Sequence, residues 1–132
     1  MGARPFFEDL VEQMTVTVEK QFLRVSSYRE AVRPGRLELV MDIECELEDR
    51  DVIIVEDIID TSKTAEFILR HVESKNPGSL RICALIDKRG ENAAGPRPDY
   101  TGFQVDEGFL VGYGMDYMEK GRAFEDIYLL QE

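Results

Sequence analysis

The chain has 132 residues, with 27 acidic against 16 basic side chains, and its formal net charge is -11. This length predicts a single domain over residues 1–132, and 43% hydrophobic with 33% charged residues excludes collagen-like and fully disordered proteins. The negative charge argues against a nucleic-acid partner, and no apolar run reaches the roughly 18 residues that a membrane-spanning helix needs.

The first part of the chain predicts a helix, two strands and two polar connections. Residues 5–14 begin with a proline, which suits a first helical turn, and their apolar side chains recur at helical spacing. Residues 15–25 and 37–43 are interpreted as strands. The polar segment 26–35 ends in Pro-Gly and predicts a loop, and the acidic segment 44–50 predicts a surface turn.

The second part predicts a strand–helix–strand unit. Residues 51–55 (DVIIV) form the β-branched run typical of a strand buried on both faces, and residues 80–86 (LRICALI) form another. Between them, residues 63–75 carry an apolar stripe at i, i+3, i+4, i+7. The order predicts an α/β fold with a mainly parallel sheet flanked by helices. A Gly/Pro-rich loop is expected at 89–98, and short strands at 109–113 and 127–130.

The two cysteines, Cys45 and Cys83, lie far apart and form no CxxC motif. This spacing argues against a disulfide framework and a zinc site. It predicts reduced thiols, which are typical of a cytoplasmic protein.

The segment from Val52 to Thr64 (VIIVEDIIDTSKT) carries the chemistry. A buried strand leads into Glu56 and Asp57, Asp60 follows three residues later, and a hydroxyl-rich turn opens the next helix. Ligands of open α/β sheets bind at the carboxyl ends of strands, and a helix N-terminus suits a phosphate. The acids could then grip sugar hydroxyls, hold Mg²⁺ or move a proton. Taken singly, each acid is an ordinary strand end and the Thr-Ser pair an ordinary helix cap. The whole arrangement favours a site.

This segment resembles the phosphoribosyl diphosphate (PRPP) binding motif of type I phosphoribosyltransferases. Further matches lie at residues 86–88 (IDK), 109–117 (FLVGYGMDY), 26–28 (SSY) and at Arg122, in the order found in hypoxanthine(-guanine) phosphoribosyltransferases. The resemblance implies the type I fold and Mg²⁺-dependent transfer of ribose 5-phosphate from PRPP to hypoxanthine or guanine. It also implies a homodimer or homotetramer.

The resemblance assigns roles around the sugar phosphate. It matches Glu56 and Asp57 to the residues that hold the ribose hydroxyls and take part in metal binding. Asp60 matches the general base at the purine N7. The 5′-phosphate loop corresponds to Asp60, Thr61, Ser62, Lys63 and Thr64, with Ser62 standing where glycine is common.

The resemblance also assigns residues to the purine and the pyrophosphate. Lys88 matches the donor to the 6-oxo group, Phe109 the aromatic that stacks on the base, Leu110 the residue whose backbone faces the base edge, and Asp116 a carboxylate near the purine that holds Mg²⁺. Gly2 and Arg122 match pyrophosphate-binding residues. Ser27 and Tyr28 match a mobile loop that closes over PRPP.

Each of these residues also has an ordinary interpretation. Lys88 and Arg89 could be a solvated strand end, Phe109 a core residue, and Asp116 with Arg122 an exposed ion pair. His71, near the end of its helix, is interpreted as a surface residue that complements the helix dipole.

Members of the resembled family carry an N-terminal portion, including a strand that ends in Leu-Lys-Gly, before the position of Gly2. Met1 stands where that lysine would be. We therefore expect either a fragment or a natural short form completed by a partner chain, with weak or absent turnover when alone. The alternatives to an enzyme are a non-catalytic nucleotide-binding regulator of the same fold and, with less support, a signalling receiver domain.

Overall fold

The computed structural model describes residues 3–30, 33–60, 63–89, 95–105, 109–114 and 126–130, with 27–30, 33–36, 109–111 and 128–130 described by their backbone. Along the chain, the elements are α1 (Arg4–Gln13), β1 (Arg24–Glu30), β2 (Arg33–Met41), β3 (Asp51–Ile59), α2 (Lys63–Glu73), β4 (Ser79–Asp87), β5 (Tyr100–Gln104), β6 (Phe109–Val111) and β7 (Tyr128–Leu130).

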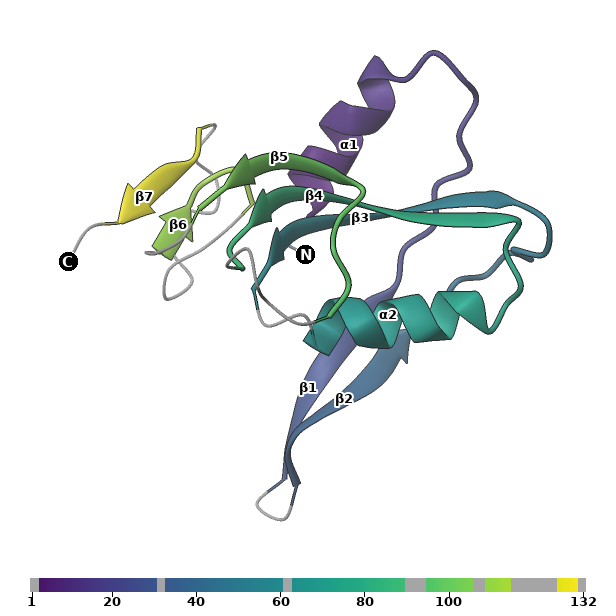
Figure 1. Ribbon diagram of the computed structural model, residues 1–132, viewed down its shortest axis with the longest axis horizontal. Coiled ribbons are helices and arrows are strands. Elements are labelled where there is room, and N and C mark those ends of the chain that lie inside the picture. Colours follow the sequence, from purple (N-terminus) through teal and green to yellow (C-terminus); the bar gives the residue numbers. More distant parts are fainter. Residues whose placement is uncertain are drawn as a thin grey trace.

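A parallel β3–α2–β4 unit forms the centre of the molecule and confirms the predicted α/β class (Figure 1). The ladder runs the length of both strands, from Asp51 opposite Ser79 to Ile59 opposite Asp87. β5 adds to the other edge of β4, also in parallel. The carboxyl ends of β3 and β4 therefore lie side by side.

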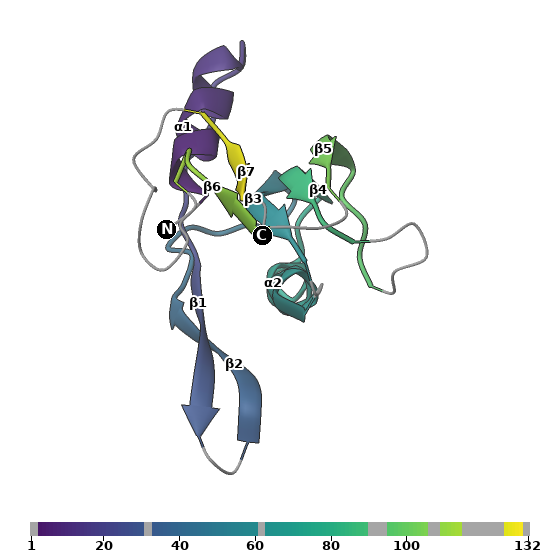
Figure 2. The ribbon, with the colours of Figure 1, turned by 90° about the vertical axis from the view of Figure 1, so that its left-hand side faces the viewer.

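Helix α2 covers one face of this sheet, as the view along its axis shows (Figure 2). Its buried side chains are Ala65, Ile68 and Val72, which are spaced at i, i+3 and i+7 as the stripe predicted. Ala65 packs with Ile82 and Ala84 of β4. Burying an Ile or Val side chain, as at Ile68 and Val72, contributes about 1.5–3 kcal/mol. The buried stripe therefore fixes the helix against the sheet.

The opposite face of the sheet meets α1 and the antiparallel β6–β7 pair. Leu85 belongs to a buried cluster with Ile86, against which Phe6 packs, and the hydroxyl of Tyr113 donates to the carboxylate of Asp9 on α1. The predicted helix is confirmed, although none of its side chains is fully buried.

Strands β1 and β2 form an antiparallel ribbon that projects away from the sheet (Figures 1 and 2). The base of the ribbon is fixed to α2, because Val25 and the neighbouring Leu23 and Ile43 pack against Ile68 and Val72.

Two predictions about this part of the chain are wrong. Residues 14–23 form no strand, and Val16 is 64% exposed. Segment 26–35, predicted as a loop, contributes to both strands of the ribbon. The predicted surface turn 44–50 is an irregular and mostly exposed connection, although Leu47 within it is buried. Strand β5 was not predicted.

Two further observations concern the lengths of the helices and the state of the cysteines. Among the residues described, the helices have 10 and 11 residues and neither is long and apolar enough to cross a membrane. Cys45 and Cys83 are both free thiols, as the sequence predicted.

Candidate active site

The predicted acidic segment lies at the carboxyl end of β3. The strand carries Glu56 and Asp57 in its second half, and Asp60 follows its end as an exposed residue. Helix α2 begins three residues later, with Lys63 and Thr64 exposed in its first turn. The structure thus places a carboxylate-rich strand end directly before a helix N-terminus, the arrangement that favours a sugar phosphate.

The two acids on β3 are held where a negative charge is costly. Burial, with a further contribution from the charge of Asp57, raises the pKa of Glu56 to about 7. Burial also raises the pKa of Asp57, although the backbone N–H of Ile58 donates to its Oδ1 atom at 2.8 Å. Carboxylates in this setting bind most favourably to groups that supply hydrogen-bond donors or positive charge, such as vicinal hydroxyls or a cation.

Lys88 lies beside Asp60. The β3–β4 ladder pairs Ile59 with Asp87, and the backbone N–H of Lys88 donates to the carbonyl oxygen of Ile59 at 2.9 Å. Asp60 and Lys88 are the next residues along the two adjacent strands. An acid and an amine predicted from distant parts of the sequence therefore share one edge of the sheet.

Asp87 and Arg89 flank Lys88 and are both buried, with 4% and 5% of their surfaces exposed. The Oδ1 atom of Asp87 accepts from the backbone N–H of Arg89 at 2.9 Å and from its Nε at 3.1 Å. Burial disfavours the charge of Asp87, but the hydrogen bonds and charge of Arg89 outweigh it and hold the pKa of Asp87 below its usual value. This buried pair excludes a solvated strand end for Arg89.

Sequence reasoning missed this ion pair. Its only trace in the sequence is the charged triplet that ends an apolar strand, because which members of such a triplet turn inward depends on the packing around it. Arg89 also donates through Nη1 to the carbonyl oxygen of Pro96, which lies in a segment predicted only as a loop.

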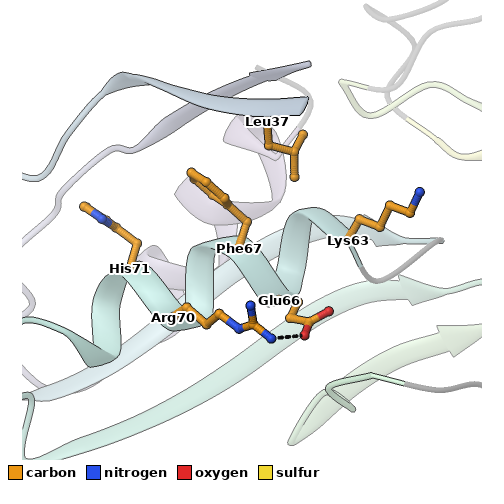
Figure 3. A pocket seen from close by; sticks show the side chains of 6 residues that line it. All are labelled: Leu37, Lys63, Glu66, Phe67, Arg70 and His71. Carbon is orange, nitrogen blue, oxygen red and sulfur yellow. Dashed lines mark hydrogen bonds and ion pairs between the residues drawn. The ribbon is translucent and has the colours of Figure 1, made fainter. Parts of the chain in front are cut away.

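A groove of about 560 Å³ lies between α2 and β2 (Figure 3). Its lining combines apolar and charged side chains: Leu37, Lys63, Glu66, Phe67, Arg70 and His71. Phe67 and His71 point from the helix toward β2, and Leu37 points from β2 toward the helix (Figure 3). Since the ribbon ladder pairs Leu37 with Ser27, the predicted mobile residue Ser27 lies on the strand next to the one that borders the groove.

His71 joins the helix to the ribbon, which a purely surface interpretation did not anticipate. Its side chain is 23% exposed, and its Nε2 atom lies 2.7 Å from Oδ1 of Asp42, just beyond β2. Lys75 approaches the other oxygen of Asp42 at 3.6 Å. The bond to His71 lowers the pKa of Asp42, an effect that burial partly opposes.

The other predicted site residues are only partly placed. Phe109 and Leu110 lie in β6, where the ladder pairs them with Leu130 and Leu129, and Tyr28 lies in β1. Five predicted residues lie outside the described residues: Gly2, Thr61, Ser62, Asp116 and Arg122.

The comparisons with known proteins identify the class. The chain matches the phosphoribosyl transferase domain over residues 1–118. It is 35% identical over 131 residues to hypoxanthine-guanine phosphoribosyltransferase of Bacillus subtilis, covering 98% of this chain and 73% of that protein. It is 36% identical over 132 residues to a hypoxanthine-guanine-xanthine phosphoribosyltransferase of Tritrichomonas foetus, covering 99% and 72%.

Solved structures agree with these sequences. The hypoxanthine phosphoribosyltransferase of Staphylococcus aureus aligns with a TM-score of 0.89 at 32% identity, covering 99% of this chain and 72% of that chain. A variant of the Trypanosoma cruzi enzyme, solved as a ternary complex with substrates, aligns with a TM-score of 0.90 at 32% identity and the same coverage.

The fold is thus that of a type I phosphoribosyltransferase. The chain belongs to the phosphoribosyltransferase family, and within it to the group of hypoxanthine-guanine phosphoribosyltransferases.

Proposed function

We propose that this chain is a purine-salvage enzyme that transfers ribose 5-phosphate from PRPP to hypoxanthine or guanine, giving IMP or GMP and pyrophosphate. The observation that carries the proposal is the hydrogen bond from Lys88 to Ile59, because it sets Lys88 and Asp60 next to each other at the ends of β4 and β3.

An oxopurine offers complementary groups to such a pair. Its N7 atom and its 6-oxo group lie on the same edge of the ring system. We assign Lys88 as the donor to the 6-oxo oxygen, and Asp60 as the base that accepts the proton at N7. An amino group at the 6-position would bring a donor against the Lys88 donor, so the arrangement favours oxopurines over adenine. Phe109 would stack on the base, and the backbone of Leu110 would face its edge.

The sugar phosphate fits the other half of the site. We assign Glu56 and Asp57 to the two ribose hydroxyls, since ionised carboxylates form strong hydrogen bonds with such donors. Their negative charge would also stabilise the positive charge that develops on the sugar as pyrophosphate departs. The turn from Asp60 to Thr64 would bind the 5′-phosphate through its hydroxyls and the N-terminus of α2.

The remaining assignments concern pyrophosphate and closure. Gly2 and Arg122 would bind pyrophosphate, where a guanidinium suits two phosphate oxygens. Ser27 and Tyr28 lie on the projecting β1–β2 ribbon, which is suited to close over PRPP and exclude water.

A magnesium ion fits this chemistry. The described residues contain no cluster of three or more His, Cys, Asp or Glu side chains suited to a metal. Mg²⁺ however commonly takes one or two carboxylates and completes its shell with substrate phosphates and water. We propose that the carboxylates of Glu56, Asp57 and Asp116 would hold the ion, directly or through water, and that it would supply positive charge next to the pyrophosphate leaving group.

The test follows the loss of free hypoxanthine with PRPP and Mg²⁺ present. We expect PRPP-dependent consumption that is weak for this chain alone, and we expect Asp60→Asn to lower kcat further, by about 10²–10⁴-fold, the usual contribution of a general base. Thr64→Ser, which retains the hydroxyl in the phosphate turn, is the matched control. Binding of IMP without any consumption would favour the regulator over the enzyme.

We also propose a cytoplasmic, self-associating protein. The free thiols support the location. Large apolar side chains remain exposed on the sheet, notably Ile53 (44%), Tyr100 (46%) and Phe103 (61%), and support a homodimer or homotetramer. Sedimentation velocity at micromolar concentrations would show a single monomeric species if this part of the proposal is wrong.

A further inference from the structure

The Asp87–Arg89 pair has no direct place in the chemistry proposed above. Both side chains are almost fully buried, so a substrate in the site would not contact them directly. A buried ion pair gives little net stability compared with apolar side chains of similar volume, because desolvation opposes the attraction between the charges. The contribution of this pair is therefore more a matter of geometry than of stability.

The pair closes a ring of hydrogen bonds around Lys88. Oδ1 of Asp87 accepts from both the backbone N–H and the Nε of Arg89, so the residues on either side of Lys88 are tied to each other. Arg89 then reaches the carbonyl oxygen of Pro96 and joins the turn to the segment before β5. The Arg89 fork makes these contacts at once, and a lysine with its single amine lacks that geometry.

The backbone on each side of this ring is also fixed. The N–H of Lys88 donates to the carbonyl of Ile59 at 2.9 Å, and the N–H of Val105 donates to the carbonyl of Asp87 at 3.0 Å. Strands β3 and β5 thus hold the turn from both sides, and the ion pair holds its interior.

We propose that Asp87 and Arg89 are positioning residues that fix the Lys88 turn and thereby set the preference of the site for a 6-oxo over a 6-amino purine. This inference rests on the proposed function of Lys88. The site can distinguish a 6-oxo from a 6-amino purine only if the Lys88 amine stays at one defined place. An amine that is free to move can avoid the 6-amino group of one purine and still contact the 6-oxo oxygen of the other through a water molecule.

The experiment measures nucleotide binding by calorimetry, so it does not depend on turnover. The dissociation constants of IMP and AMP are compared for the unchanged chain, Arg89→Lys, Arg89→Gln and the double variant Asp87→Asn/Arg89→Gln. We expect the AMP-to-IMP ratio to fall by about tenfold in Arg89→Gln, which corresponds to one hydrogen bond with a charged donor. Arg89→Lys preserves the buried positive charge and serves where Arg89→Gln fails to fold; its ratio should also fall.

The matched control is Arg81→Gln on the same strand. Arg81 is exposed and donates to the hydroxyl of Tyr100 at 2.8 Å, at the end of β4 remote from Lys88. Its replacement should leave the ratio within twofold of the unchanged chain. A lower melting temperature of the Arg89 variants with an unchanged ratio would show a merely structural role and overturn the inference.

Lys88→Gln separates this inference from the proposed function. We expect the ratio to fall in Lys88→Gln and to fall no further when Arg89→Lys is added, because Arg89 acts through Lys88. An unchanged ratio in Lys88→Gln would overturn the assigned role of Lys88 itself. Additive losses in Lys88→Gln/Arg89→Lys would overturn only the inference about Arg89.

Discussion

Glu56 shows how a single residue of the site links binding chemistry to stability. Its pKa is raised to about 7 by burial and by the charge of Asp57, whereas an unfolded chain leaves it near the ordinary value of 4.5. The folded state thus binds this proton more tightly than the unfolded state does. The resulting stabilisation is complete below about pH 4.5 and is lost as the pH rises through 7.

Replacing Glu56 by Gln should remove this dependence. The unchanged chain should lose free energy of unfolding between pH 5 and pH 8. In Glu56→Gln we expect this loss to be smaller by up to about 3 kcal/mol, which is the free energy that corresponds to the raised pKa of Glu56. Urea denaturation at both pH values measures the change. Glu73→Gln, at an exposed position near the end of α2, is the control and should leave the fall unaltered. Equal falls in Glu56→Gln and the unchanged chain would contradict the prediction.

At the same scale, the sequence predicted the acids at the end of β3 but not the buried role of Arg89, which follows β4. Glu56, Asp57 and Asp60 lie in one short segment, where a buried strand followed by several carboxylates is visible without any tertiary information. Arg89 becomes meaningful only through contacts with Asp87 and Pro96, which the folding of a separate segment creates.

The helices and strands also differ in how well the sequence predicts them. The β3–α2–β4 unit was predicted because its apolar periodicity is local and its strands pair with each other. The strand predicted at 37–43 overlaps β2, but the outer part of the ribbon was missed because the polar segment 26–35 resembles a loop, and Pro34 argues against a strand interior. The ribbon accommodates this proline opposite Arg29, immediately after a shift in register between Tyr28 and Arg29.

Strand β5 depends on a glycine, Gly102, for its close approach to β4. A Cβ atom at Gly102 would lie 2.7 Å from the carbonyl oxygen of Leu85 on β4. We expect Gly102→Ala to lower the free energy of unfolding by about 1–3 kcal/mol, because the two strands must separate to admit the methyl group. Thermal or urea unfolding measures this loss. Thr101→Ala, at the neighbouring exposed position of β5, should cost less than about 1 kcal/mol, and a similar loss in both variants would refute the steric explanation.

The contact between His71 and Asp42 anchors the ribbon to α2. We expect His71→Ala to reduce the hydrogen-exchange protection of β1 and β2 amides by about fivefold, which is typical of one hydrogen bond of about 1 kcal/mol. His71→Gln should retain most of the protection, since its amide N–H still donates to the carboxylate of Asp42.

Two comparisons check this expectation. Amides of β3 and β4 should keep their protection in both variants, because Ile59 and Ile82 remain buried there. Uniform loss across the ribbon and the sheet in His71→Ala would indicate global destabilisation and contradict a local anchor.

At the scale of the whole molecule, the net charge of -11 opposes the approach of an anionic substrate such as PRPP. The screening length falls from about 30 Å at 10 mM salt to about 8 Å at 150 mM, so added KCl removes the long-range repulsion before it disrupts contacts within the site. At constant Mg²⁺, we expect kcat/KM for PRPP to rise at least about twofold over this range. The KM for hypoxanthine, which is uncharged, should stay constant and serves as the internal control. A steady decrease of kcat/KM for PRPP with salt would show that local cations, and not the charge of the whole chain, govern the encounter.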